Sequence, residues 1–133
     1  SRDRAQHWEH VPFEDMFPGG SYCRGLLVNP GTPSTIYLAA GAGGGGAPAG
    51  TREAGALFRS RDTGESWERE DLGETPPSRM AQIAVDHAAP SHVYCCAQRG
   101  QVYMSHDSGE MWQKTQVPVE MSRSLHIYPM VCG

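Results

Sequence analysis

One short stretch of this sequence combines a hydroxyl, a carboxylate, a glycine and a tryptophan, and it occurs three times. Ser60–Trp67 reads SRDTGESW and Ser105–Trp112 reads SHDSGEMW, while Ser1–Trp8 reads SRDRAQHW, with Ala5 in place of the glycine. A catalytic carboxylate needs an acid or base partner and a cleft that holds both groups. The eight residues contain no such partner, so the stretch alone does not predict catalysis.

The same residue types suit a tight turn between two strands. The carboxylates of Asp62 and Asp107 can accept hydrogen bonds from nearby backbone N–H groups. Gly64 and Gly109 can adopt positive φ because they carry no Cβ atom. The leading serine can bond the turn from its other side, and the final tryptophan can bury a large ring between layers. We therefore predict a structural role for Ser60, Asp62, Gly64, Trp67, Ser105, Asp107, Gly109 and Trp112.

Three arginines stand shortly before apolar stretches, each of which we expect to form the first strand of a longer repeat unit. Arg24 and Arg123 each precede an apolar pair by two residues, and Arg79 precedes Ile83 by four. Converging guanidinium groups suit carboxylate or phosphate recognition, because each binds two oxygens at once. Alternatively, each arginine pairs with a local acid, as Glu120 would allow for Arg123, or caps the entrance of a strand. Arg24, Arg79 and Arg123 are the candidate ligand-binding residues.

The cysteines and histidines show no metal-binding spacing. Cys23, Cys95, Cys96 and Cys132 lack the C-x-x-C pairs of a zinc site. We interpret all four as small buried apolar residues, with a disulfide or a redox role as the alternative. The six histidines fall at unrelated positions of the repeat, which favours turns and surface positions. We expect neither a metal nor a cofactor.

The charge and hydropathy of the chain restrict its partners. The formal net charge is -4, whereas a nucleic-acid surface would need a basic excess. No stretch approaches the roughly 18 apolar residues of a membrane-spanning helix, and no signal peptide opens the sequence. We expect no nucleic-acid partner and no membrane segment in this chain.

The short stretches mark the ends of longer repeats. Trp67 and Trp112 are 45 residues apart, and Trp8 and Trp67 are 59 residues apart. A glycine-rich insert at 41–55 accounts for the difference. VNPGTPSTIY in the first repeat also aligns with VDHAAPSHVY in the second.

The repeats predict the fold class. Each unit reads as four short strands separated by turn residues, which is the pattern of a propeller blade. We predict one all-β domain over 1–133, a partial propeller of about two and a half blades of four antiparallel strands. The predicted units are 9–67, 68–112 and a partial unit at 113–133.

The repeated stretches resemble the Asp-box, or BNR, repeat of sialidases, xyloglucan-cleaving glycosidases, sorting-receptor ectodomains and photosystem assembly factors. Met111 departs from the usual Ser or Thr of this repeat, and Ala5 departs from the usual glycine. The resemblance implies that the boxes are structural turns at the periphery. It also implies that ligands bind on the opposite face, where the insert at 41–55 would act as a spacer or a lid.

The resemblance implies a non-catalytic module that binds a protein or a glycan, or serves as a scaffold. The alternative is part of a glycoside hydrolase of the sialidase or xyloglucanase type. The stretch IYLAAGAGGGG holds no carboxylate where xyloglucan-cleaving relatives carry one, which favours the non-catalytic interpretation. An extracellular or periplasmic location is slightly favoured by the resemblance. Because about two and a half blades cannot close a ring, we expect self-association or further blades in a longer chain.

Overall fold

The computed structural model describes residues 1, 3–42 and 55–116. Most of the glycine-rich insert, and the partial repeat unit beyond Gln116, lie outside these residues. Arg123, one of the three candidate binding residues, and Cys132 are also outside them.

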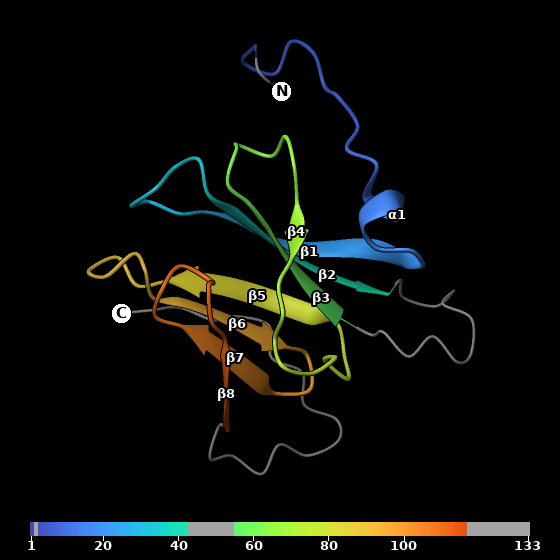
Figure 1. Cartoon of the computed structure of the whole chain (residues 1–133). Coiled ribbons are helices and arrows are strands. Elements are labelled where there is room, and N and C mark those ends of the chain that lie inside the picture. The colour runs from blue at the N-terminus through green and yellow to red at the C-terminus, as the bar shows by residue number, and fades with distance from the viewer. Residues whose placement is uncertain (2, 43–54, 117–133) are drawn as a thin grey trace.

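The described residues form two four-stranded antiparallel sheets and one short helix, α1 (Phe13–Met16). Each sheet is a meander in which consecutive strands are neighbours (Figure 1). Blade 1 contains β1 (Gly20–Val28), β2 (Ile36–Ala42), β3 (Gly55–Ser60) and β4 (Glu68–Arg69); blade 2 contains β5 (Met80–Val85), β6 (Val93–Ala97), β7 (Gln101–Ser105) and β8 (Gln113–Gln116). The predicted all-β fold with blades of four antiparallel strands is confirmed.

The first loop of each blade begins with the same kind of turn. In blade 1, the Asn29 side chain accepts a hydrogen bond from the backbone N–H of Gly31, at 2.8 Å. In blade 2, the Asp86 carboxylate accepts one from the N–H of Ala88, also at 2.8 Å. Such Asx turns reverse the chain at the end of a strand, and they explain why aligned sequences give aligned hairpins.

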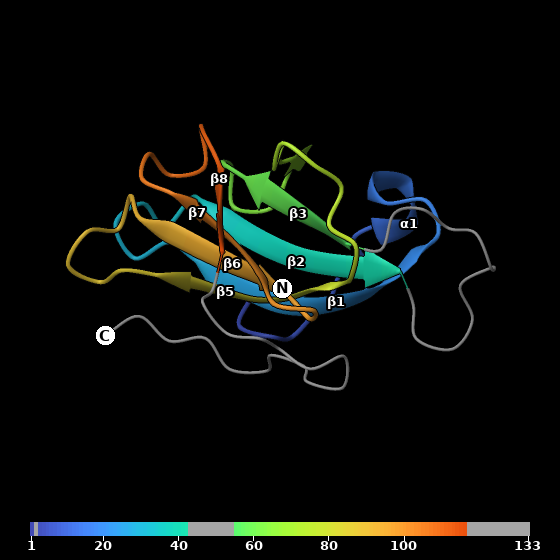
Figure 2. The ribbon, with the colours of Figure 1, turned by 90° about the horizontal axis from the view of Figure 1, so that it is seen from below.

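A hydrophobic core fills the space between the two blades. Its fully buried side chains come from both sheets, and β5 contacts β1, β2 and β3 across the interface. Figure 2 shows β1 and β5, the first strands of the blades, running beside each other. The largest of these core residues are Tyr37, Leu57, Met80, Val93, Cys95 and Tyr103.

A second apolar cluster lies on the side of blade 1 that faces away from blade 2. Phe17, Ala40, Ala56 and Phe58 are buried there. The rings of Phe13 and Phe17 meet Phe58 with centroids 6.3 and 6.0 Å apart, so α1 and the residue that follows it cover part of this side. Among the described residues, no helix has the length and apolar character needed to cross a membrane.

The buried character predicted for the cysteines is confirmed for two of them and wrong for one. Cys95 and Cys96 are buried as free thiols, and burial raises the pKa of both. Cys23 is a free thiol on the surface. It lies on β1, the edge strand of its sheet, beside a bulge between Cys23 and Gly25, where cover from neighbouring strands is reduced.

Gly55 packs against the connection between the two blades at Ser78–Met80, and this contact leaves no room for a side chain. A Cβ atom at this position would stand 2.3 Å from the backbone oxygen of Ser78. We expect Gly55→Ala to lower the free energy of unfolding by about 1–3 kcal/mol, the usual cost of overpacking. Chemical denaturation measures this change. Gly25→Ala is the matched control, because the nearest atom to its added Cβ is 3.4 Å away; equal losses in both variants would contradict the packing described.

Candidate functional site

All three Asp-box stretches form the same hydrogen-bonded turn. In the box between β3 and β4, the Ser60 hydroxyl donates to Asp62 at 2.8 Å and accepts from the N–H of Gly64 at 2.8 Å. Asp62 in turn accepts from the backbone and the hydroxyl of Ser66. The box between β7 and β8 repeats this arrangement with Ser105, Asp107, Gly109 and the N–H of Met111.

The first box, which lacks the glycine, adopts the turn as well. The Ser1 hydroxyl donates to Asp3, and it accepts from the N–H of Ala5 at 2.8 Å. His7 replaces the second hydroxyl and contacts Asp3 through Nδ1. Ala5 has a φ of 67°, whereas Gly64 and Gly109 have φ values of 90° and 92°. The alanine therefore accepts the left-handed backbone conformation that glycine adopts more readily.

Hydrogen bonds within the boxes stabilise the ionised carboxylates. The hydroxyl and backbone N–H of Ser66 lower the pKa of Asp62 to about 2. The backbone N–H of Met111 is the main cause that lowers the pKa of Asp107. These carboxylates are therefore charged at neutral pH, and they already accept hydrogen bonds from residues of their own turn. This arrangement suits a structural acceptor.

The second and third boxes, between β3 and β4 and between β7 and β8, lie at the end of their blade where the first strand connects to the second. The N–H of Thr63 donates to the Ser34 carbonyl at 3.0 Å, and the N–H of Ser108 donates to the Ser91 carbonyl at 2.8 Å. Each box is thereby joined to the first loop of its own blade. Tyr22 pairs with Gly41 at the opposite end of β2, so the start of β1 is at the other end of the sheet.

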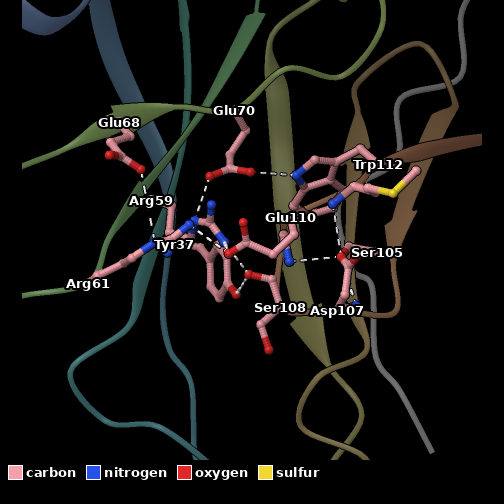
Figure 3. A network of polar contacts seen from close by, with 12 residues as sticks. Tyr37, Arg59, Arg61, Glu68, Glu70, Ser105, Asp107, Ser108, Glu110 and Trp112 are labelled. Carbon is pink, nitrogen blue, oxygen red and sulfur yellow. Dashed lines mark hydrogen bonds and ion pairs between the residues drawn. The ribbon is translucent and has the colours of Figure 1, made fainter.

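A polar network joins blade 1 to the third box, as Figure 3 shows. The Ser108 carbonyl accepts hydrogen bonds from Tyr37 Oη at 2.8 Å and from Arg59 Nη1 at 2.6 Å. Arg59 Nε forms an ion pair with Glu70 at 2.7 Å, and Glu70 accepts a hydrogen bond from Trp112 Nε1 at 2.6 Å. We call Tyr37, Arg59, Glu70, Ser108 and Trp112 the inter-blade clasp.

The side chains that blade 1 contributes to the clasp are buried, and those of Ser108 and Trp112 are partly buried. The side chains of Arg59 and Glu70 are 7% and 4% exposed, and burial raises the pKa of Glu70 despite its contacts with Trp112 and Arg59. Outside the clasp, Glu110 accepts from both Arg59 and Arg61, at 3.0 and 2.6 Å. A Cβ atom at Gly109 would stand 3.1 Å from Arg59 Nη1, so this glycine also makes room for the clasp.

The structure brings two of the three predicted arginines together around Tyr22. The guanidinium carbon of Arg24 lies 4.8 Å from the centroid of the Tyr22 ring, and that of Arg79 lies 5.1 Å from it. All three side chains are partly buried. Arg24 and Tyr22 come from β1, and Arg79 precedes β5, so the cluster spans the first strands of both blades.

Neither Tyr22 nor the turn that supports Arg79 was predicted from the sequence. The N–H of Gln98 donates to the Arg79 carbonyl at 2.9 Å, and the N–H of Arg99 donates to Ser78 Oγ at 3.0 Å. The turn between β6 and β7 thus holds the backbone at Arg79. Tyr22 stands two residues before Arg24, so regular alternation along the expected strand would put both on one face, and this was the available signal. In the structure, the bulge between Cys23 and Gly25 interrupts that alternation at Arg24.

Two other features outside the arginine cluster bring acidic or histidine side chains together. A cavity of about 460 Å³ opens between β3 and the connection at 69–76. Its acidic side chains include Glu74, which binds Tyr103 Oη and Lys114 Nζ at 2.7 Å each. The rings of His92 and His106 meet edge to face with centroids 4.5 Å apart. Within the described part of the chain, no group of three or more His, Cys, Asp or Glu residues could hold a metal ion.

A family model, Sortilin-Vps10, described as sortilin, neurotensin receptor 3, matches residues 55–131, more than half of the chain. The chain belongs to the Sortilin-Vps10 family. This membership confirms the resemblance to propellers with BNR, or Asp-box, repeats.

Solved structures give the same fold. YCF48 from Cyanidioschyzon merolae matches with a TM-score of 0.57 and 15% identity, over 87% of this chain and 30% of that one. An ancestral GH74 enzyme matches with a TM-score of 0.57 and 23% identity, over 74% of this chain and 13% of the enzyme. Both are propeller proteins, and the chain spans less than a third of either. A search of curated proteins found no match.

The Asp-box turn can be tested at the buried serine. Ser60→Ala removes the acceptor of the Gly64 N–H and a donor to Asp62. We expect a loss of about 1–2 kcal/mol in the free energy of unfolding at neutral pH. Urea denaturation measures this loss. A Ser60→Ala protein as stable as the parent would contradict the structural role.

Acid titration tests the charge of Asp62. Its folded-state pKa of about 2 lies below the ordinary 3.8, so its ionised form contributes stability above pH 4 that is lost as the pH falls towards 2. We expect Ser66→Ala to raise the pKa of Asp62, because the largest cause of the lowering is the Ser66 hydroxyl. NMR titration of the carboxyl carbon measures it. Thr63→Ala is the control, since its hydroxyl donates to a backbone carbonyl instead.

Removal of Arg59 tests the clasp. Arg59→Met introduces the residue found at the equivalent position 104 and leaves Glu70 buried without its ion-pair partner. We expect a loss of about 3–5 kcal/mol at neutral pH. The loss should shrink as the pH falls, because the pKa of Glu70 is already raised by burial and the neutral acid needs no counter-charge.

Two further variants sharpen this test. Arg61→Met removes a half-exposed arginine that binds the same Glu110, and we expect it to cost no more than about 1 kcal/mol. Glu70→Gln combined with Arg59→Met should recover stability, since the amide can still accept from Trp112. Similar losses for Arg59→Met and Arg61→Met would show that the buried ion pair is not what joins the blades.

Proposed function

We propose that this chain is a non-catalytic propeller module that binds a protein ligand through carboxylate groups. The observation that carries the proposal is the cluster of Arg24 and Arg79 around Tyr22. The two guanidinium groups come from different blades and approach one aromatic ring. A ligand held there would contact both blades at the start of their first strands.

The electrostatics of the cluster favour an anion. Both guanidinium groups gain from the electron-rich face of Tyr22, but the ring carries no net charge and leaves the positive charge of Arg79 in place. Among the described residues, no carboxylate forms an ion pair with Arg79. A carboxylate bound beside the Tyr22 ring would pair with the charge of Arg79 and could accept hydrogen bonds from the forks of Arg79 and Arg24.

The position of the cluster suits a rigid binding site. Hydrogen bonds from Gln98 and Arg99 hold the backbone of Ser78 and Arg79, and the Tyr22 ring limits the freedom of both guanidinium groups. Less conformational entropy is then lost when a ligand binds. The Asp-boxes and the clasp lie at the other end of the sheets. The description of the Sortilin-Vps10 family names a receptor, which agrees with binding in place of catalysis.

Titration with acidic ligands tests the proposal. The probe is a peptide of several glutamates with blocked termini. Isothermal titration calorimetry at low and high salt measures its affinity for the protein. We expect binding that weakens as salt rises, because exposed ion pairs are screened. Arg24→Ala and Arg79→Ala should each weaken binding about tenfold, which corresponds to about 1.4 kcal/mol. Arg4→Ala, which removes an exposed arginine from the first box, is the charge-matched control.

The outcomes separate a protein ligand from an acidic sugar. Sialic acid presents a carboxylate on a sugar ring, so stronger binding of sialic acid than of the peptide would favour a glycan ligand. Equal and negligible binding of both probes by the parent and the arginine variants would end the proposal. Tyr22→Leu should weaken binding while leaving the net charge unchanged, and full binding by this variant would show that the aromatic ring does not position the arginines.

A further inference from the structure

The turn between β6 and β7 brings a neutral polar group to the site of the two arginines. Met80 is opposite Ala97 in the sheet of blade 2. This register continues for one more residue, because the N–H of Gln98 donates to the Arg79 carbonyl at 2.9 Å. Gln98 is therefore directly opposite Arg79. Residues that are directly opposite in an antiparallel pair project from the same face, with Cβ atoms about 5 Å apart.

Gln98 is almost enclosed, yet its amide has no partner. The residue is 6% exposed. Within the described part of the chain, its side chain neither donates nor accepts a hydrogen bond, and its amide is not one of the groups sealed off from solvent. Buried polar groups are normally hydrogen-bonded, so an exception needs an explanation. The small exposed part of Gln98 therefore includes its amide end, where a ligand can reach it.

Hydrogen bonds fix the backbone on both sides of this amide. The N–H of Gly100 donates to the Ala97 carbonyl at 3.0 Å and closes the turn. The N–H of Arg99 donates to Ser78 Oγ at 3.0 Å, so the turn is also joined to the segment before β5. A side chain on a fixed backbone loses less conformational entropy when it binds a ligand.

The Gln98 amide adds a kind of hydrogen bond that the arginines cannot make. A guanidinium group only donates, whereas a glutamine amide offers an acceptor oxygen and two donor hydrogens. In an extended peptide, the N–H and C=O of one residue point to the same side, so they match the acceptor and the donor of such an amide. A hydrocarbon chain that carries only carboxylates has no N–H for the Gln98 oxygen.

We propose that Gln98 binds the backbone N–H and C=O of the ligand residue whose acidic side chain pairs with Arg79. This inference rests on the proposed function and makes it more specific. The ligand is an extended peptide segment that contains Asp or Glu, and the site contacts its backbone and its side chain together. Arg79 supplies the attraction for the charge, and Gln98 is the specificity-determining residue that favours a peptide over other carboxylates.

Two probes of equal charge test the inference. One is the glutamate peptide with blocked termini, and the other is an oligomer of acrylic acid with the same number of carboxylates and no amide. Isothermal titration calorimetry at low salt measures both affinities. We expect the parent to bind the peptide about tenfold more tightly than the oligomer. In Gln98→Leu, the affinity for the peptide should fall about tenfold, and the affinity for the oligomer should stay unchanged.

Three further variants complete the test. Gln113→Leu is the matched control, because it makes the same change at an exposed position beside the third box, and it should bind both probes like the parent. Arg79→Ala should weaken the binding of both probes, because it removes charge. Gln98→Glu keeps the shape of the side chain, and its carboxylate opposite Arg79 should compete with both probes. Thermal denaturation checks that each variant is folded.

Four results would overturn the inference. If a folded Gln98→Leu binds the peptide like the parent while Arg79→Ala loses both probes, the proposed function stands and Gln98 has no part in it. Equal losses of both probes in Gln98→Leu would show that Gln98 supports the site without contacting the peptide backbone. Parent-like binding of both probes by Gln98→Glu would show that the amide lies away from the ligand. A parent that binds neither probe would end the proposed function and this inference together.

Discussion

The contact of Arg59 with the third Asp-box is the interaction on which the arrangement of the two blades depends. A guanidinium that is 7% exposed needs compensation on every side, and it obtains this from Glu70, Glu110 and the Ser108 carbonyl. The carbonyl belongs to a residue with a φ of 59°, so the turn of the box aims it at blade 1. The backbone conformation of the turn thus fixes where the next blade sits.

This dependence separates what could be predicted from sequence from what could not. The Asp-box motif and the four-stranded blades depend on neighbours within a few residues, or on a repeat that is visible in the chain. The clasp joins residues 49 positions apart, such as Arg59 and Ser108, and has no second copy, because Met104 and Thr115 replace Arg59 and Glu70. A single long-range pair leaves no periodic signal in one sequence.

Burial could not be predicted from residue type for a related reason. Leu26 and Ile83 read alike in the repeat, and only the blade beside each decides whether it is covered. Cys23 differs from Cys95 and Cys96 because it lies on an edge strand. For the arginines, their place near the starts of first strands indicated where Arg24 and Arg79 lie, but the ring that both approach required the packing of β1 against the start of β5.

The two ends of the blades therefore differ in how their charged side chains are used. At one end, the carboxylates of the boxes accept hydrogen bonds within their own turns, and these bonds lower the pKa of Asp62 to about 2. At the other end, the guanidinium groups of Arg24 and Arg79 approach the ring of Tyr22, which carries no net charge. The clasp and the apolar core together hold blade 2 against blade 1, with β1 and β5 in contact along the interface. They therefore also hold Arg24 and Arg79, which come from different blades, beside the same ring.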